Sequence, residues 1–225
     1  MVKVWDIWVR LFHWSFAITI SYLLISGETG YKFIDWHRMA GEVAICLVLF
    51  RLIWGFTGSS TARLLPLFRS PRSAVRHLLE VFRSRSSKSA PEHGSEYGHN
   101  ASGGYAVLAL LALIAIQAST GMFIADEDEF VEGRFYGVAS GTVSDFLYQV
   151  HHYNAHVIQV LVLVHIAMIF FYLLYARINL IKTMFTGSAV RNSVAGEDEP
   201  VLKSVWLGLA VAVFSGLVYY FLFAA

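Results

Sequence analysis

Four histidines lie at positions where an imidazole could bind a metal within or beside an apolar segment. Two of them, His151 and His165, stand fourteen residues apart in the stretch HHYNAHVIQVLVLVHIAMIF. In a helix this spacing spans roughly 21 Å and leaves the two side chains about 40° apart on one face. The other two, His13 and His37, lie near the ends of two earlier apolar segments. Imidazoles at two depths of a bilayer are what a pair of six-coordinate haems would require.

Depth in the bilayer decides how these four histidines pair. His37 and His151 begin their segments at one face of the membrane, whereas His13 and His165 lie toward the other face. The expected ligand pairs are therefore His37 with His151 at the outer face and His13 with His165 at the inner face. Each pair takes one ligand from the fourth span, which would carry both haems in a four-helix core. Histidine at both axial positions favours electron transfer over oxygen binding.

These histidines also have a plainer structural reading. A single histidine near a membrane boundary is usually an interfacial polar group, and this reading is acceptable for His13 or His37 alone. His165 is different, because a polar ring several turns deep in lipid is costly and normally functional. His152 and His156 do not share the face of His165. Their i,i+4 spacing could bind a metal ion together with an acidic side chain, but two ligands do not make a site, so a polar surface role is favoured.

Composition places the chain in the integral-membrane class. Of its 225 residues, 56% are apolar and 15% are charged, and the mean hydropathy is +0.56, values outside the range of ordinary soluble domains. The expected fold is an all-α integral membrane protein, with a four-helix haem-binding transmembrane bundle and a fifth C-terminal transmembrane helix. The five stretches long enough to cross about 30 Å of hydrocarbon as helices are residues 11–27, 37–57, 103–125, 152–176 and 203–224.

Cysteine usage limits how a haem could be attached. The single cysteine, Cys46, excludes an internal disulfide, and the lack of a CxxCH motif excludes the usual covalent c-type attachment. Any haem is therefore expected to be held by coordination and packing alone. The first apolar stretch is followed by GETGYKFIDW and not by a small-residue cleavage site, so a cleaved signal peptide is not expected.

Basic residues are distributed unequally between the two sides of the predicted membrane. With the N-terminus in the cytoplasm, fourteen of the seventeen Lys and Arg residues lie on the inner side, and only Lys32, Arg38 and Arg134 lie outside. The outer side also carries the acidic run DEDEFVE at 126–132. This strong positive-inside signal predicts a membrane protein with a cytoplasmic N-terminus and, after five spans, a C-terminus on the outer side. Its basic face would meet anionic lipid headgroups and not nucleic acid.

Two connecting segments carry further structure. The inner segment over 58–102 contains SPRSAVRHLLEVFRS, which predicts an amphipathic helix lying on the membrane surface. The outer loop over 126–150 ends in VSDFLYQV, which predicts that the fourth helix begins before it enters the membrane. We divide the chain into a haem-binding domain over 1–185 and a linker with the additional helix over 186–225.

Small and basic residues near the histidines are candidate cofactor contacts. Gly41 and Gly121 would each let a flat porphyrin approach the helix that contains the glycine. Small residues equally favour close packing of one helix against another. Arg10, Arg38 and Arg51 lie at the two proposed haem depths and could pair with propionates. For Arg10 and Arg38, snorkelling to headgroups is an equal alternative. Arg51 lies deeper, which favours the propionate reading.

Several motifs, taken in order, resemble the bacterial cytochrome b561 family, whose dihaem b-type members are related to the cytochrome b subunit of nickel–iron hydrogenases. The resemblance covers about residues 3–185. It implies that His13, His37, His151 and His165 hold two b haems. It also implies a bacterial inner membrane, with the outer side facing the periplasm, and an electron path between the quinone pool and a partner redox protein. The motifs are VWDIWVRLFHW, WHRMAGE, FRLIWGFTGSSTARL, GHNASGG, IQASTGMF and the H-x13-H of the fourth span.

The chain departs from this family pattern at a few positions. Ala101 stands where a proline is usual, His152 where a glutamate is common and His156 where an asparagine is common. The fifth span lies beyond the shared core. These differences bear on the partner and the quinone site more than on haem binding.

The expected function is transmembrane electron transfer through two b haems, between quinone and a periplasmic or membrane redox partner such as cytochrome c or a hydrogenase-like subunit. No separate catalytic residue is expected, because the redox chemistry belongs to the cofactor. The acidic run at 126–132 could dock a basic partner. Two alternatives remain: a superoxide oxidase that passes electrons to quinone, and a non-redox membrane anchor whose histidines bind zinc or iron.

Overall fold

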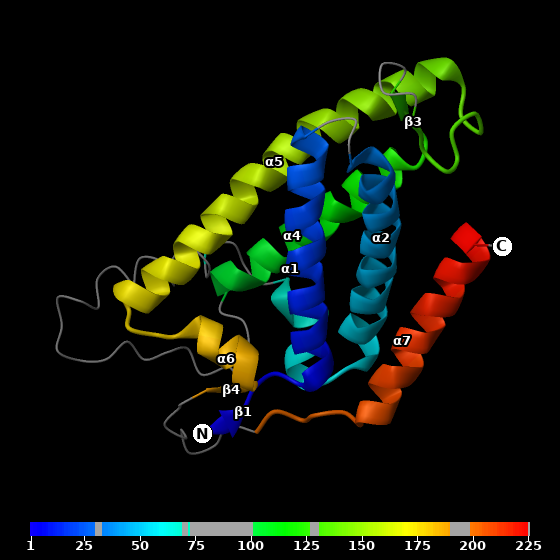
Figure 1. The fold of residues 1–225 in the computed structure, drawn as a ribbon. Coiled ribbons are helices and arrows are strands. Elements are labelled where there is room, and N and C mark those ends of the chain that lie inside the picture. The colour runs from blue at the N-terminus through cyan, green and yellow to red at the C-terminus, as the bar shows by residue number, and fades with distance from the viewer. Residues whose placement is uncertain (30–32, 69–71, 73–100, 127–130, 190–198, 225) are drawn as a thin grey trace. The chain divides into compact units, whose positions relative to one another are not determined.

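The computed structural model describes residues 1–29, 33–68, 72, 101–126, 131–189 and 199–224 (Figure 1). The long helices are α1 (Ile7–Glu28), α2 (Ile34–Thr57), α4 (Ala101–Gly121), α5 (Gly141–Leu174) and α7 (Val205–Tyr219). The shorter helical elements are η2 (Ser60–Ala62), η3 (Leu65–Leu67), α6 (Leu180–Thr186) and the π-helical turn η4 (Tyr220–Ala224). Two short antiparallel pairs complete the described part, β1 (Val2–Lys3) with β4 (Ser188–Ala189) and β2 (Ala125–Asp126) with β3 (Val131–Glu132).

Five of the described helices are long and apolar enough to cross a membrane, which confirms the predicted all-α membrane class. The fourth long helix already includes VSDFLYQV, as predicted, because α5 begins at Gly141. The third span is shorter than predicted: α4 ends at Gly121, not at 125. After Gly121 the backbone turns into the β2–β3 hairpin, in which Gly133 N–H donates to the Ile124 carbonyl at 2.8 Å. Apart from Arg72, the predicted surface helix within 70–84 lies outside the described residues.

The chain divides into two compact units, and each long helix contributes residues to both. The first unit comprises Met1–Leu11, Leu52–Ala109 and Leu163–Leu209. The second unit comprises Phe12–Arg51, Leu110–Val162 and Ala210–Ala225.

In the first unit, the start of α1 is held by a buried carboxylate. Asp6 is the N-cap of α1, and its Oδ1 accepts a hydrogen bond from Val9 N–H at 2.8 Å, which satisfies one of the free donors of the first turn. Its Oδ2 accepts from Trp54 Nε1 at 3.2 Å. Asp6 is 6% exposed and Trp54 is fully buried. This cap explains why α1 begins at residue 7, four residues before the apolar stretch predicted a span.

The end of α6 is joined to the N-terminal strand in the same unit. Gly187 follows α6 with φ at 76°, a left-handed conformation that favours glycine. Its carbonyl accepts from both Val4 N–H and Trp5 N–H, at 2.8 and 3.0 Å. Thr61 donates to the Val4 carbonyl at 2.6 Å. These bonds join the N-terminal segment to the end of α6 and to η2.

In the second unit, polar side chains link apolar helices in pairs. Asn154 on α5 donates to the Leu113 carbonyl and to Gln117 Oε1 of α4, each at 2.8 Å. At the start of α5, Ser144 donates to the Phe123 carbonyl at 3.0 Å. Helices in lipid gain little from burying apolar surface against each other, so such hydrogen bonds help to fix their register. They position the α4 and α5 faces that carry the site described below.

Replacing Asp6 by alanine should remove the cap and lower the free energy of unfolding by about 1–2 kcal/mol. Asp6→Asn should lose less, because its amide oxygen can still accept from Val9. The midpoint of thermal unfolding of the detergent-solubilised protein, followed by tryptophan fluorescence, measures the difference. Asp145→Ala, at an exposed carboxylate of α5, is the control and should change the midpoint little; equal losses in both variants would contradict the cap.

Candidate functional site

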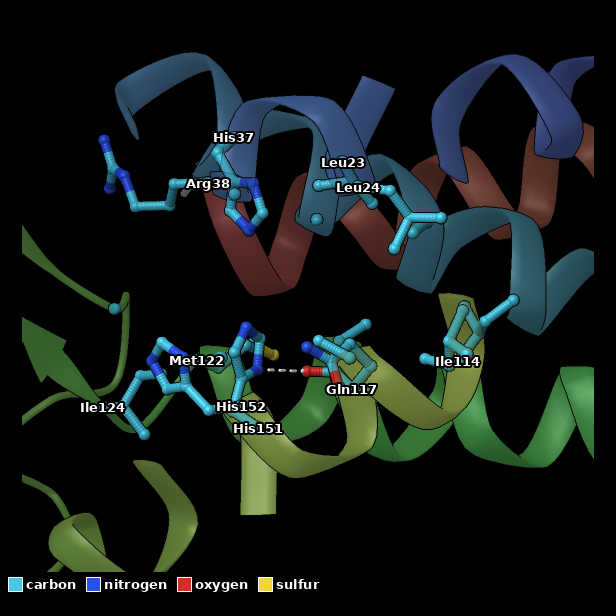
Figure 2. A pocket seen from close by; sticks show the side chains of 18 of the residues that line it. Leu23, Leu24, His37, Arg38, Ile114, Gln117, Met122, Ile124, His151 and His152 are labelled. Carbon is cyan, nitrogen blue, oxygen red and sulfur yellow. Dashed lines mark hydrogen bonds between the residues drawn. The ribbon is translucent and has the colours of Figure 1, made fainter. Parts of the chain in front are cut away.

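The second unit contains a cavity between histidines of α2 and α5, which we call the His37–His151 pocket (Figure 2). Its wall is formed by α1, α2, α4, α5 and the segment 132–134. The volume is about 240 Å³, whereas one buried water needs only about 10–15 Å³ on the same measure. Apolar side chains such as Leu23, Leu24 and Ile114 line much of it. The pocket is therefore large enough for an organic ligand.

His37 is held by the end of α1. Its Nδ1 lies 2.9 Å from Ser26 Oγ, and Ser26 is 2% exposed. The Ser26 hydroxyl donates to the Leu23 carbonyl at 3.3 Å, which leaves its oxygen as the acceptor for an N–H at Nδ1. Gly27 lies beside the ring, since a Cβ there would be 3.3 Å from His37 Cε1. Thus α1 supplies both a hydrogen-bond partner and the space that the imidazole occupies.

His151 is held in the same way by α4. Its Nδ1 lies 3.0 Å from the Gln117 carbonyl, the dashed line in Figure 2, and 3.2 Å from Thr120 Oγ1. Because a carbonyl can only accept, the hydrogen of the neutral ring belongs on Nδ1. Gly121 makes room for the ring: a Cβ there would lie 2.9 Å from His151 Cε1, which is too close.

The two imidazoles face each other across the pocket. Figure 2 shows the rings pointing toward one another, and their centroids are 6.5 Å apart with an interplanar angle of 70°. With both Nδ1 atoms engaged, the Nε2 atoms are left to bind a ligand. A metal-bound imidazole nitrogen lies about 2 Å from the ion, so two rings that ligate one ion from opposite sides have centres about 6.3 Å apart. The observed separation fits this arrangement.

The number of protein ligands available decides which kind of metal group the pocket could hold. Among the described residues, no group of three or more His, Cys, Asp and Glu side chains could hold a metal ion together. A zinc ion would need three or four protein ligands, whereas haem brings four equatorial nitrogens and needs only two axial ones. The donor set of the pocket, with its apolar wall, therefore fits haem and does not fit a bare ion.

Three residues predicted as cofactor contacts also line the pocket, together with a second arginine. Arg38, predicted as a propionate partner, is among the lining residues, as are Gly41 and Gly121. A Cβ built on Gly41 would meet no protein atom within 4 Å, so this glycine faces open space. Arg134 also lines the pocket and forms an ion pair with Glu42 at 3.7 Å.

The other predicted ligand pair is divided between the two units. His13 belongs to the second unit and His165 to the first, so their pairing stays a prediction. Arg51 is 3% exposed, and its Cζ lies 5.9 Å from the centroid of the Phe12 ring, a cation–π contact. Arg10 donates a hydrogen bond to the Phe185 carbonyl at the end of α6.

His152 and His156 are among the residues that line the His37–His151 pocket, and both are exposed. His152 packs against Tyr148 with ring centroids 4.2 Å apart. His156 Nδ1 lies 3.2 Å from Gln159 Oε1, and the Gln159 amide donates to Glu28 Oε1 at 2.8 Å. These contacts are compatible with the polar surface role favoured from the sequence.

Several residues of the site were not singled out from the sequence. They are Ser26, Gly27, Glu42, Gln117, Thr120 and Arg134. The signal that could have found Gln117 and Thr120 is a polar residue inside an apolar span, since such residues are rare in lipid and normally bind a partner. Both belong to the IQASTGMF motif, which indicated the family resemblance but predicted no contact for either side chain.

Comparison with known proteins adds the family. The model of the prokaryotic cytochrome b561 family matches residues 4–187, most of the chain, and ends before α7. No curated protein and no solved structure matched the chain. The resemblance inferred from the motifs is confirmed, and family membership agrees with a pocket whose donor set fits haem. The chain thus belongs to the prokaryotic cytochrome b561 family of multi-pass bacterial membrane proteins, which use b-type haem for electron transfer across the membrane.

Proposed function

We propose that this protein transfers electrons across the membrane through two b haems, with His37 and His151 as the axial ligands of one and His13 and His165 as those of the other. The observation that carries the proposal is the pair of opposed imidazoles 6.5 Å apart, each held through Nδ1. Haem, when bound, supplies the one-electron redox chemistry. The protein binds it, orients it and sets its electrostatic surroundings.

The hydrogen bonds at Nδ1 prepare both histidines of the pocket for iron. An N–H donated to an oxygen fixes the tautomer, so that the Nε2 lone pair points at the ligand. It also makes Nε2 more basic, which strengthens its bond to ferric iron in particular. Ser26 performs this task for His37, and the Gln117 carbonyl performs it for His151.

The second haem is inferred from α5 and α1. His165 follows His151 on the same helix at a distance of roughly 21 Å, which would separate two haems along the membrane normal. His13 lies on α1, the helix that also supports His37 through Ser26. An imidazole at the depth of His165 is expensive in lipid unless it binds a partner. Arg51, buried beside Phe12, is our candidate for its propionates.

Gly41 and Arg38 would complete the contacts of the first haem. Gly41 lies one turn after His37, and its Cα faces open space in the pocket, where a flat ring could approach. Arg38 lines the same pocket and offers a guanidinium to a propionate.

The excess of basic residues on one side supports a cytoplasmic N-terminus, with the His37–His151 pocket toward the periplasm. Electrons would then pass between the quinone pool and a periplasmic or membrane partner, such as a cytochrome c or a hydrogenase-like subunit. The acidic run at 126–132 suits a basic partner, because opposite charge speeds encounter.

A second candidate is oxidation of superoxide at the same pocket. Arg38, adjacent to the ligand His37, lines the pocket and would attract the anion. Each superoxide would leave as O₂ after giving up one electron, and two such electrons with two protons would reduce one quinone to quinol. Non-redox zinc binding is disfavoured, because in the described part of the chain no three His, Cys, Asp or Glu side chains are placed to hold a metal ion together.

Removing one ligand should remove one haem. We expect two haems per chain in the purified protein and one in His151→Ala and in His165→Ala, counted by the pyridine haemochrome method. His156→Ala, at an exposed histidine on the same helix, should keep both. A His165→Ala protein with its full haem content would contradict the second centre, and the same result for His151→Ala would contradict the first.

Filling the space beside His151 should displace its ring. Gly121→Ala puts a Cβ 2.9 Å from His151 Cε1, so we expect loss or strong alteration of one haem in the absorption and electron paramagnetic resonance spectra. Gly216→Ala is the matched control, since a Cβ there meets no atom within 4 Å. Unchanged spectra in both variants would show that the ring does not depend on this glycine.

Superoxide separates the two candidate functions. If the pocket oxidises it, superoxide should reduce the haem of the purified protein without any partner, and Arg38→Gln should slow this reduction severalfold by removing the attracting charge. Stopped-flow absorption measures the rate. No reduction by superoxide, together with rapid reduction by quinol, would favour the partner-linked function.

A further inference from the structure

A buried carboxylate lies in the wall of the His37–His151 pocket. Glu42 on α2 is 8% exposed and lines the pocket, five residues after His37. Its Oε1 lies 3.7 Å from Arg134 Nε, and its Oε2 accepts a hydrogen bond from the Tyr219 hydroxyl at 3.2 Å. A carboxylate at this position within an apolar span is costly unless it is paired and hydrogen-bonded. Both conditions are met here, by two segments distant from α2 in the sequence.

Tyr219 belongs to α7, which lies outside the family match. One turn before it, the Ser215 carbonyl accepts from Cys46 Sγ at 3.4 Å, and Cys46 lies one turn after Glu42. The contacts between α7 and α2 therefore repeat in register over one helical turn. Ser215 is 1% exposed.

An aromatic contact joins η4, the turn that follows α7, to Phe135, the residue next to Arg134. Phe223 lies 5.3 Å from the Tyr219 ring and 6.2 Å from the Phe135 ring, between centroids. Phe135 is adjacent to Arg134 in the chain. The end of α7 thus contacts the carboxylate directly, through Tyr219, and the following turn η4 contacts the segment of its basic partner, through Phe223.

We propose that Glu42, Arg134 and Tyr219 form a charge-setting triad that tunes the redox potential of the centre held by His37 and His151, and that α7 completes this triad. The inference rests on the proposed function, because it needs that centre. Reduction adds a negative charge to the iron, so a carboxylate in the pocket wall disfavours the reduced form and a guanidinium favours it. The tyrosine hydroxyl partly offsets the carboxylate charge and keeps it in place beside Arg134. Glu42 and Tyr219 are positioning residues that act through the field and not as iron ligands.

Redox titration of the purified holoprotein, followed by haem absorption, tests the triad. Glu42→Gln removes the negative charge with little change of shape, so it should raise the midpoint potential. At a fixed applied potential the ratio of reduced to oxidised haem should then rise severalfold. Tyr219→Phe removes the offsetting hydroxyl and should shift the potential in the opposite direction, by less. Tyr220→Phe, at an exposed neighbour on the same helix end, is the control and should cause no shift.

The shift must occur in the centre that His151→Ala abolishes. Unchanged potentials in Glu42→Gln and Tyr219→Phe with full haem content would overturn the triad, as would equal shifts in Tyr219→Phe and Tyr220→Phe. If the Glu42→Gln protein loses haem, the triad is tested by comparing the midpoint potentials of Tyr219→Phe and Tyr220→Phe. A shift confined to the centre that survives His151→Ala would also contradict the triad, while leaving the two-haem function intact; haem counting in His151→Ala tests that function separately.

Discussion

The site depends on one kind of interaction, the hydrogen bond that each facing histidine makes through Nδ1. In lipid no water can satisfy an imidazole nitrogen, so a ring without a protein partner would be costly and free to rotate. The Gln117 carbonyl holds His151, and the Ser26 hydroxyl holds His37. Each bond comes from a helix other than the one that bears the histidine. The opposed geometry of the pocket is therefore a property of four helices together.

Small residues complete this arrangement at the same helix ends. Gly27 follows Ser26 directly, and Gly121 follows Thr120, so each supporting helix offers a polar acceptor next to a residue without a side chain. The acceptor sets the direction of the ring, and the glycine lets the ring approach the helix. Small residues in membrane helices commonly serve close helix packing. Here they admit the imidazole, which refines the two alternatives that the sequence left open for Gly121.

Much of the fold was predictable because it follows from local pattern. Long apolar runs predict membrane helices, and the polar and aromatic start of α5 at residue 141 was visible in VSDFLYQV. The facing of His37 and His151 was predicted from depth alone, and the structure places them 6.5 Å apart. Partners such as Ser26 for His37, or Tyr219 for Glu42, were not predictable, since they join segments 11 and 177 residues apart through tertiary packing. The boundary of α1 was missed because a cap, and not hydropathy, sets it.

The length of α5 has a consequence for how a redox partner can be served. Its 34 residues span about 51 Å at 1.5 Å per residue, well beyond the roughly 30 Å of a hydrocarbon core. His151 is the eleventh residue of this helix, about 15 Å along its axis from the first turn. A water-soluble partner that touched only that tip would remain remote from a haem held by His151, and electron transfer would be slow, because electron tunnelling weakens steeply with separation. If His151 holds a haem, such a partner would have to approach the side of the helix near the pocket-lining residues Tyr148 and His152.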